Sequence, residues 1–460
     1  MSARRRFPED QHLVNPAHEL AHEITPERRR RLLVITYHFP PDGAVGGLRW
    51  SGLSKYLARL GWEVHVVTAA EPRGEVAVPG VHRHHRIRRR TLNDVYNSLA
   101  APVRRRRGVA ATGPAAPAVQ HSPRVTPTLF GRLRTAAGLA LSFPDAGRGW
   151  VWRAGSTARA LLKAETFDAV ITSGPPHTAH FAGMVATFGT GIPHLIDMRD
   201  PWRGTGPDWC GYPIKSRFIH TLVGLFESFA FRSARHVIVN TREFADALER
   251  ARPNLAVDQI SNGTDTELLP RRTPDLFDGV SIAYAGTIYL GRSFSTLLSA
   301  LESVVRDRPD DAARITVRIA GSITEAQREQ FRAELATRGL EGMVQLCGVL
   351  SRSEALTLLR RSHLALVLAQ AQPTQIPAKL YECVGIGVPT LVVSEASSAA
   401  TREARRIGGL VLEPDDVAGM RRVLDDLLDA RVSATIMPTA PISYESLAKQ
   451  LDRILRLAVP

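Results

Sequence analysis

"RLLVITYHFPPDGAVGGLRWSGLSKYLARLGWEVHVVTA", residues 31–69, decides the fold class of this chain. Its first seven residues form an apolar run, which is typical of a strand that is covered on both faces. Residues 48–61 then carry leucine and tyrosine at helical spacing and end at Gly61, and residues 63–69 form a second apolar run. A strand, a helix and a strand in this order predict a parallel βαβ unit.

The loop at 37–50, between that first strand and the helix, holds two prolines and three glycines. A glycine loop at the end of a first strand favours phosphate binding. Its spacing is not GxGxxG, however, and no acidic residue follows in the proper place about 20 residues later. A dinucleotide site is therefore not indicated.

The same alternation runs through the rest of the chain and predicts two α/β halves. In the first half we expect strands at 167–174, 192–198 and 236–241 and helices at 150–165, 178–189, 216–234 and 242–251. After a break at 260–279, we expect strands at 280–286, 315–321, 344–350, 364–369 and 389–394 and helices at 294–307, 324–339, 352–362 and 377–387. Ligands of such sheets bind at the carboxyl ends of the strands, so a cleft between the halves is the expected site.

The predicted organisation has five segments. They are a disordered leader (1–30), a Rossmann-like domain (31–265), an interdomain link (266–278), a second Rossmann-like domain (279–440), and a C-terminal segment (441–460) whose amphipathic helix packs back across the joint. Two domains fit a length of 460 residues, because single cores stop growing at about 250–300 residues.

The composition, 44% hydrophobic and 23% charged residues, is that of a soluble globular protein. Three widely separated cysteines without CxxC spacing indicate a reducing compartment, with no metal cluster and no disulfide framework. The chain holds no apolar stretch long enough to span a membrane and no signal peptide, so we expect a cytoplasmic protein.

A formal net charge of +14 is concentrated in one segment, because residues 82–107 hold nine arginines and one acid. The Pro- and Ala-rich residues that follow extend this basic excursion to about residue 145. It is interpreted as a solvated loop, as a contact with anionic lipid headgroups, or as a contact with nucleic-acid phosphates. Leucine and phenylalanine side chains between 125 and 144 favour a peripheral contact with the membrane, and no nucleic-acid partner is expected.

"TQIPAKLYECVGIGVPTLVV", residues 374–393, carries the chemistry of the second half. Pro377 suits a first helical position, and the helix start with Lys379 favours an anion. Glu382 can accept hydrogen bonds from sugar hydroxyls. The alternative is that Lys379 and Glu382 form only a surface pair three residues apart.

These residues resemble the donor-binding motif of the family 4 retaining glycosyltransferases, whose architecture of two Rossmann domains facing across a cleft is called GT-B. The resemblance extends from about residue 31 to 457. Residues 173–202 resemble a signature of bacterial members that build exopolysaccharide and cell-surface glycans, and residues 283–301 resemble the start of their donor domain.

The resemblance implies a role for individual residues. It implies that Glu382 binds the donor ribose and that Arg292 and Lys379 bind the diphosphate. The other implied donor-binding positions are Gly46, Gly47, Gly286, Thr287, Gly321, Gly348, Val349, Ala378 and Leu380. The implied acceptor-binding positions are Arg49, His177, Arg199 and Asp200. The implied catalytic positions are Arg292, Lys379, Asp200 and His177.

The resemblance also implies a reaction. A sugar passes from a nucleotide diphosphate sugar to a hydroxyl of a lipid-linked or surface glycan acceptor, with retention at the anomeric carbon, and the departing phosphate takes the acceptor proton. No metal and no cofactor is expected. Replacing Arg49 by alanine is expected to weaken transfer without unfolding the protein. Because Thr374 and Thr287 stand where many members have a glutamate and an arginine, a noncatalytic nucleotide-sugar-binding partner of the same fold remains an alternative.

Overall fold

The structure is a computed structural model, and it describes residues 29–41, 45–69, 77–88, 145, 147–202, 217–288, 292–430, 438 and 441–459. The expected leader up to residue 28 and most of the basic excursion, residues 89–144, lie outside these residues.

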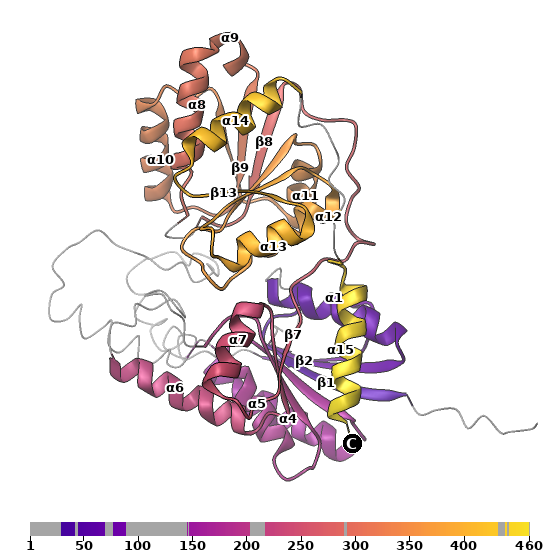
Figure 1. Ribbon diagram of the computed structural model, residues 1–460. Coiled ribbons are helices and arrows are strands. Elements are labelled where there is room, and N and C mark those ends of the chain that lie inside the picture. The colour runs from indigo at the N-terminus through magenta and orange to yellow at the C-terminus, as the bar shows by residue number, and fades with distance from the viewer. Residues whose placement is uncertain are drawn as a thin grey trace, which may run out of the picture.

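The first domain is built on a parallel sheet of seven strands in the order β3-β2-β1-β4-β5-β6-β7 (Figure 1). The strands are β1 (Arg30–Thr36), β2 (Trp62–Ala69), β3 (Val81–Ile87), β4 (Ala169–Gly174), β5 (His194–Met198), β6 (His236–Val239) and β7 (Val257–Gln259). Its helices are α1 (Val45–Arg59), α4 (Arg148–Ala164), α5 (Ala179–Thr187), α6 (Arg217–Arg232) and α7 (Arg242–Ala251).

The second domain is built on a parallel sheet of six strands in the order β10-β9-β8-β11-β12-β13. The strands are β8 (Val280–Ala285), β9 (Ile315–Ala320), β10 (Val344–Gly348), β11 (Leu364–Leu368), β12 (Thr390–Val393) and β13 (Leu410–Leu412). Its helices are α8 (Ser295–Asp307), α9 (Pro309–Ala312), α10 (Glu325–Thr337), α11 (Arg352–Arg360), α12 (Ala378–Ile386), α13 (Ala399–Ile407) and α14 (Val417–Leu428). Two parallel α/β sheets confirm the predicted fold class.

The last helix, α15 (Tyr444–Ala458), lies against the first domain although it follows the second domain in sequence (Figure 1). Its apolar face, which includes Leu447, Leu451 and Leu455, is buried in the same core cluster as α1 and the strands β1 and β2. At its polar edge, Trp62 of β2 donates a hydrogen bond to Asp452, with an N–O distance of 2.7 Å. The chain therefore crosses between the domains twice, once near residue 265 and once near residue 441.

Strand β3 corrects the sequence interpretation of the basic excursion, which was expected to begin at residue 82. Residues 81–87 instead pair in parallel with β2 at the edge of the sheet. The sequence "VHRHHRI" does not show the apolar pattern of a strand, because its side chains are mostly charged or polar. Two of its basic side chains pair with acids of neighbouring elements: Arg83 contacts Glu165 at 2.6 Å, and His82 lies 3.5 Å from Glu63.

In the described part of the chain, we find no helix with the length and apolarity needed to cross a bilayer.

Candidate functional site

The start of α12 holds the residues on which the sequence interpretation depends. The helix begins after Pro377 and ends at Gly387, whose positive φ of 89° is suited to glycine. Glu382 lies one turn into the helix with only 6% of its surface exposed. Its Oε2 accepts a hydrogen bond from Nζ of Lys379 at 2.5 Å. The pair of Lys379 and Glu382 is therefore formed, but it is buried on the glutamate side and is not a surface pair.

A second cation holds the other oxygen of Glu382. Arg352, at the start of α11, donates hydrogen bonds from Nη2 and Nε to Oε1 of Glu382, at 2.8 and 3.2 Å. Burial alone would raise the pKa of Glu382, but Lys379 and then Arg352 outweigh it and lower that pKa. The carboxylate is thus ionised at neutral pH, and its remaining lone pairs can accept hydrogen bonds from a ligand.

Three glycines lie side by side at the carboxyl edge of the second sheet. The N–H of Gly286, after β8, donates to the carbonyl of Ala320, and the N–H of Gly321, after β9, donates to the carbonyl of Gly348. A Cβ at Gly321, whose φ is 156°, would collide with the carbonyl oxygen of Gly286. This close approach requires glycine at residue 321 and leaves a flat backbone rim, beside which Val349 is exposed.

Arg292 connects this rim to the loop between β11 and α12, residues 369–377. Its Nη1 donates to the carbonyl of Thr287 at 3.1 Å, and its Nη2 lies 3.4 Å from Oε1 of Gln372. The structure therefore places Arg292 and Thr287 together at the end of β8, on the same edge of the sheet as α12.

The loop 369–377 also contacts the first domain. Nε2 of Gln375 donates to Oδ1 of Asp200 at 2.9 Å, and the hydroxyl of Thr241 donates to the carbonyl of Thr374 at 3.2 Å. Burial raises the pKa of Asp200. Asp200 thus lies at the carboxyl end of β5 and contacts the second domain through Gln375.

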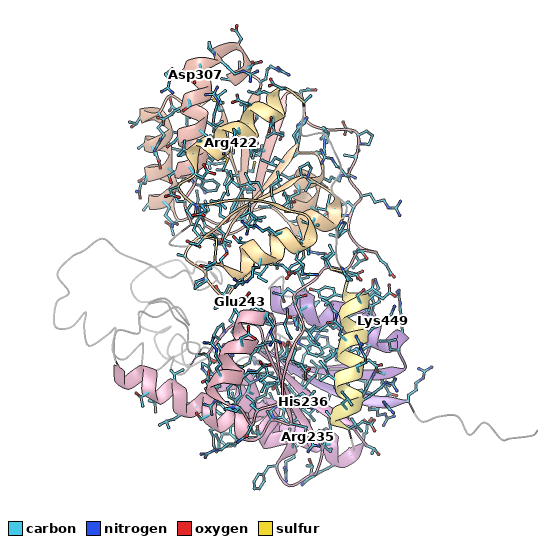
Figure 2. All side chains as sticks on the ribbon, in the orientation of Figure 1. Arg235, His236, Glu243, Asp307, Arg422 and Lys449 are labelled. Atoms are coloured by element: carbon cyan, nitrogen blue, oxygen red, sulfur yellow. The ribbon has the colours of Figure 1, made fainter. Side chains whose placement is uncertain are left out.

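A further contact between the domains lies at the amino end of α7. Glu243 of this helix pairs with Arg402 of α13, with a distance of 2.5 Å between Oε1 and Nε. Figure 2 shows Glu243 at the end of the first domain that faces the second. The carboxyl ends of both sheets therefore meet at one joint.

Arg49 does not fit its expected role as an acceptor ligand. Its side chain is 1% exposed, and its Nη2 pairs with Oδ1 of Asp197 at 3.0 Å. The same guanidinium donates to the carbonyls of Ile260 and Ser261, at 3.0 and 2.7 Å. These donors are used inside the protein, so we correct the expectation: Arg49 ties α1 to β5 and to the chain leaving β7.

The two loop glycines, Gly46 and Gly47, have reasons inside the protein as well. A Cβ at Gly46 would overlap the guanidinium of Arg199, and a Cβ at Gly47 would lie 3.0 Å from Cα of Phe39. Arg199 is 9% exposed and donates from Nη2 to the carbonyl of Pro175 at 2.7 Å. Gly46 therefore lets the start of α1 approach Arg199 at the carboxyl ends of β4 and β5, and Gly47 lets it approach the backbone of Phe39.

His177 is buried rather than open to the cleft. It is 3% exposed, and its ring stacks on Trp202 with centroids 5.2 Å apart. Burial lowers its pKa well below the usual value. The expected contacts of His177 with an acceptor and with the reacting atoms do not fit this position, so we correct them to a packing role beside Trp202.

Sequence reasoning missed Arg352 and Gln375. A signal was available for Arg352, because Ser351 and Glu354 form a capping box that marks the start of α11, which follows Gly348 in the chain. For Gln375 nothing in the sequence indicates a partner in the other domain.

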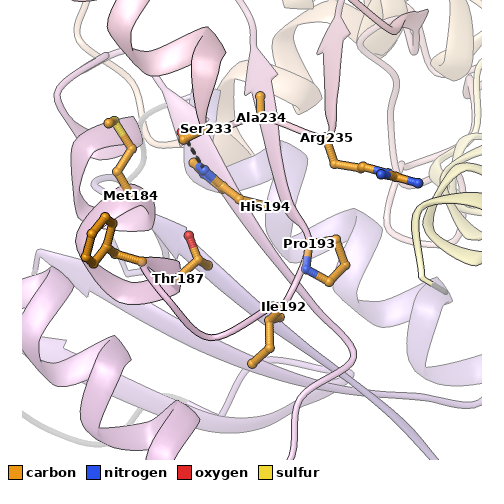
Figure 3. Close-up of a pocket in the computed structure, with 10 residues that line it drawn as sticks. Met184, Thr187, Ile192, Pro193, His194, Ser233, Ala234 and Arg235 are labelled. Atoms are coloured by element: carbon orange, nitrogen blue, oxygen red, sulfur yellow. Dashed lines mark hydrogen bonds between the residues drawn. The ribbon is translucent and has the colours of Figure 1, made fainter.

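Two hollows of the first domain lie outside the joint. One, of about 420 Å³, is lined by His194, Ser233 and Arg235 among others and lies at the amino end of β5, away from α12 (Figure 3). The other, of about 460 Å³, lies between the end of β3 and α4 and is lined by Arg86, Arg88 and Arg153 with Trp152.

The comparisons with known proteins agree with this architecture. Residues 46–263 match a family model described as a glycosyl transferase 4-like domain. No curated protein matches the chain.

Three solved structures illustrate the similarity of fold. Sucrose-phosphate synthase of Thermosynechococcus elongatus is 15% identical, with a TM-score of 0.57, over 93% of this chain and 99% of that one. HepE of Anabaena, solved with UDP, is 15% identical, with a TM-score of 0.58, over 93% and 100% of the two chains. The catalytic domain of starch synthase IV of Arabidopsis thaliana, bound to ADP and acarbose, is 11% identical, with a TM-score of 0.59, over 94% and 99%. The fold is GT-B, and its first domain matches the model of a glycosyl transferase 4-like domain.

Proposed function

We propose that the protein is a metal-independent, retaining hexosyltransferase of family 4 that uses a nucleotide diphosphate sugar. The acceptor is a hydroxyl of a lipid-linked or surface glycan, as in bacterial exopolysaccharide synthesis. The observation that carries the proposal is the buried carboxylate of Glu382, held ionised between Lys379 and Arg352 at the carboxyl edge of the second sheet. Its side chain offers acceptors for the ribose hydroxyls next to two cations for the diphosphate.

The rest of the donor follows from the neighbouring residues. The nucleoside lies along the rim of Gly286, Gly321 and Gly348, and the diphosphate meets the first N–H groups of α12 at Ala378 and Leu380. The N–H of Leu380 donates to the carbonyl of Pro377 at 3.0 Å, so this group acts through the partial positive charge of the helix start, which attracts an anion. Arg292 is placed to reach the same phosphates by leaving Gln372.

In the proposed reaction, the bond between the anomeric carbon and the phosphate oxygen breaks, and a bond from that carbon to the acceptor oxygen forms on the same face. The acceptor proton passes to an oxygen of the departing diphosphate. Lys379, Arg352 and Arg292 stabilise the charge that develops on this leaving group. Asp200 lies across the joint, where it can orient the acceptor, and Arg199 beside it forms the wall of the first domain.

The acceptor side of the proposal includes a contact with an anionic membrane. The hollow at the cleft end of β3 combines Arg86, Arg88 and Arg153 with Trp152, whose side chain is 72% exposed. Each arginine near an anionic surface contributes about 1 kcal/mol, and tryptophan prefers the membrane interface. We therefore propose a cytoplasmic protein that binds peripherally to the inner face of the plasma membrane.

Transfer is tested by a donor screen with membrane lipid as acceptor, with products analysed by mass spectrometry. One donor should give a glycosylated product, and Glu382→Ala should abolish it, whereas Glu325→Ala, which removes an exposed carboxylate of α10, should not. The configuration of the new bond is read by NMR. Release of nucleoside diphosphate with none of the donors, together with tight donor binding, would favour the noncatalytic binding protein instead.

Membrane contact is tested by flotation with vesicles that contain phosphatidylglycerol. Trp152→Ala and a deletion of 89–107, which leaves β3 intact, should each reduce flotation. Phe188→Ala, which removes an exposed aromatic side chain at the opposite end of the domain, should not. Equal flotation of all variants would contradict the membrane proposal, and retention on RNA or DNA would replace it with a nucleic-acid contact.

A further inference from the structure

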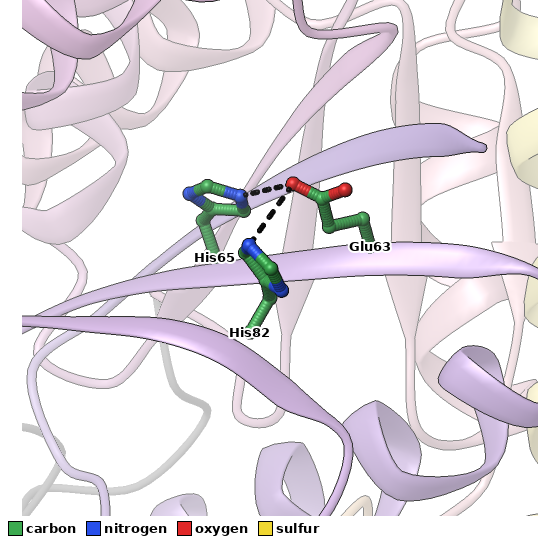
Figure 4. Close-up of side chains that lie close together, drawn as sticks. All are labelled: Glu63, His65 and His82. Atoms are coloured by element: carbon green, nitrogen blue, oxygen red, sulfur yellow. Dashed lines mark hydrogen bonds and ion pairs between the residues drawn. The ribbon is translucent and has the colours of Figure 1, made fainter. Parts of the chain in front are cut away.

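Three metal-ligand side chains meet at the amino ends of β2 and β3. They are Glu63 and His65 of β2 and His82 of β3, and their ligand atoms all lie within 4.8 Å of one another (Figure 4). Nε2 of His65 lies 3.0 Å from Oε1 of Glu63, and Nε2 of His82 lies 3.5 Å from the same oxygen. Figure 4 shows both rings directed toward the carboxylate from neighbouring strands.

We infer that Glu63, His65 and His82 form a binding site for a divalent cation of the zinc type, separate from the proposed donor site. Two imidazoles and one carboxylate suit Zn²⁺, which is commonly bound by nitrogen and oxygen ligands in tetrahedral geometry. Ligand atoms about 2.0–2.1 Å from a tetrahedral zinc are about 3.3 Å apart. The distances of 3.0 and 3.5 Å from the carboxylate oxygen to the two imidazole nitrogens lie on either side of this value, and the two nitrogens lie within 4.8 Å of each other.

The surroundings provide a rigid side and an open side. His65 is fully buried, so the fold holds its ring in place beside Glu63. The side chain of His82 is 50% exposed, which leaves solvent to supply a fourth ligand. The cation thus enters from the edge of the sheet.

One neighbour opposes the cation. Nε of Arg31 lies 3.0 Å from Oε1 of Glu63, the oxygen that the metal requires. Arg31 also contacts Glu165, with 3.3 Å between Nη1 and Oε2, so its guanidinium has a second carboxylate on which to remain when the metal displaces it. Metal and Arg31 therefore compete for one oxygen, and this competition gives the inference a prediction with a definite sign.

The position of the site indicates what the cation does. The ligands come from β2 and from the edge strand β3, which precedes the basic residues from 88 onward. They lie at the amino ends of the strands, whereas Asp200 and the joint lie at the carboxyl ends. A bound cation therefore links the edge strand β3 to β2 and takes no part in sugar transfer.

The experiment is calorimetric titration of the untagged full-length protein with ZnCl₂, with unfolding temperature as a second readout. Wild type should bind one Zn²⁺ and unfold at a higher temperature with the metal, because a ligand that binds only the folded state stabilises it. His82→Ala should weaken binding by more than the roughly 10- to 100-fold that the loss of an outer partner costs. Arg31→Gln should tighten it several-fold.

The matched control is His236→Ala. His236 contacts Asp258 at 3.0 Å but belongs to no group of three ligands among the described residues, so its loss should leave Zn²⁺ binding unchanged. Equal affinity of wild type and His82→Ala would overturn the inference, and so would weaker binding by Arg31→Gln. Because neither readout uses a nucleotide or a sugar, the result is independent of the proposed transfer reaction.

Discussion

Replacing Arg49 by alanine should destabilise the first domain, because it leaves a buried carboxylate without its cation. Asp197 is 1% exposed, and in the native protein it accepts hydrogen bonds from Arg49, from Nε1 of Trp50 at 2.9 Å and from Oγ of Ser173 at 2.8 Å. The substitution removes the only charged donor in this set. It also leaves two carbonyls, those of Ile260 and Ser261, without the guanidinium.

The size of the effect follows from the burial. Removing one partner of a buried ion pair costs about 3–5 kcal/mol. A domain of about 150–250 residues loses roughly 2–4 °C of unfolding temperature per kcal/mol. Arg49→Ala should therefore lower the unfolding temperature of the first domain by about 6–20 °C.

The loss should also depend on pH. Burial alone would raise the pKa of Asp197, and Arg49 outweighs it, so in the native protein that pKa is lowered and the pair stabilises the fold above the unfolded value of about 4. In Arg49→Ala, burial remains without the cation, so the pKa of Asp197 rises above the unfolded value. As the pH falls, Asp197 of the variant takes up a proton and no longer carries an unpaired buried charge. The difference in unfolding temperature between wild type and Arg49→Ala should therefore be smaller at pH 5 than at pH 7.

The assay is thermal unfolding followed by circular dichroism, with two control variants. Arg49→Lys keeps the charge but loses the forked hydrogen bonds, so it should fall between wild type and Arg49→Ala. Arg59→Ala removes an arginine of the same helix from a solvent-exposed pair with Glu267 and should change little. If Arg49→Ala unfolded like wild type yet lost transfer, the acceptor role would stand and the reasoning from the buried pair would be refuted.

Two further predictions concern packing. Gly321→Ala should destabilise the second domain and weaken nucleotide binding, because a Cβ there collides with the carbonyl of Gly286. Gly342→Ala, with open space around it, should do neither. A urea unfolding midpoint of Gly321→Ala equal to that of wild type would contradict the rim geometry. Leu451→Ala in the buried face of α15 should lower the free energy of unfolding by about 2–5 kcal/mol. Leu457→Ala, at a residue that is 77% exposed, should not. Equal urea midpoints of wild type and Leu451→Ala would mean that α15 is not part of the core.

Much of the fold could be predicted from the sequence because buried parallel strands are apolar runs and the helices between them are amphipathic. Strand β3 was missed because it lies at the edge of the sheet and its side chains are mostly charged or polar. His82 and Arg83 pair with acids of other elements, and the ring of His84 packs against Phe39. Periodicity does not detect an edge strand that lacks an apolar pattern.

The site was only partly predictable, and Arg49 shows why. An arginine after a glycine loop looks the same in sequence whether it binds a phosphate or a buried carboxylate. The carboxylate that decides the matter, Asp197, is 148 residues away. Arg352 was missed for the same reason, because its partner Glu382 lies 30 residues further along the chain, on another helix. The contact between Lys379 and Glu382 could be predicted because the two residues are three apart on one helix.

The most direct test of the donor site asks whether Glu382 recognises ribose hydroxyls. The measurement compares the affinities of the preferred nucleoside diphosphate and its 2′,3′-dideoxy analogue for wild type and for Glu382→Ala. Hydrogen bonds to a charged group contribute about 1.5–3 kcal/mol, so wild type should prefer the natural nucleotide by roughly 10- to 150-fold. Glu382→Ala should bind the two nucleotides almost equally. An unchanged preference in the variant would contradict the assignment of Glu382 to the ribose.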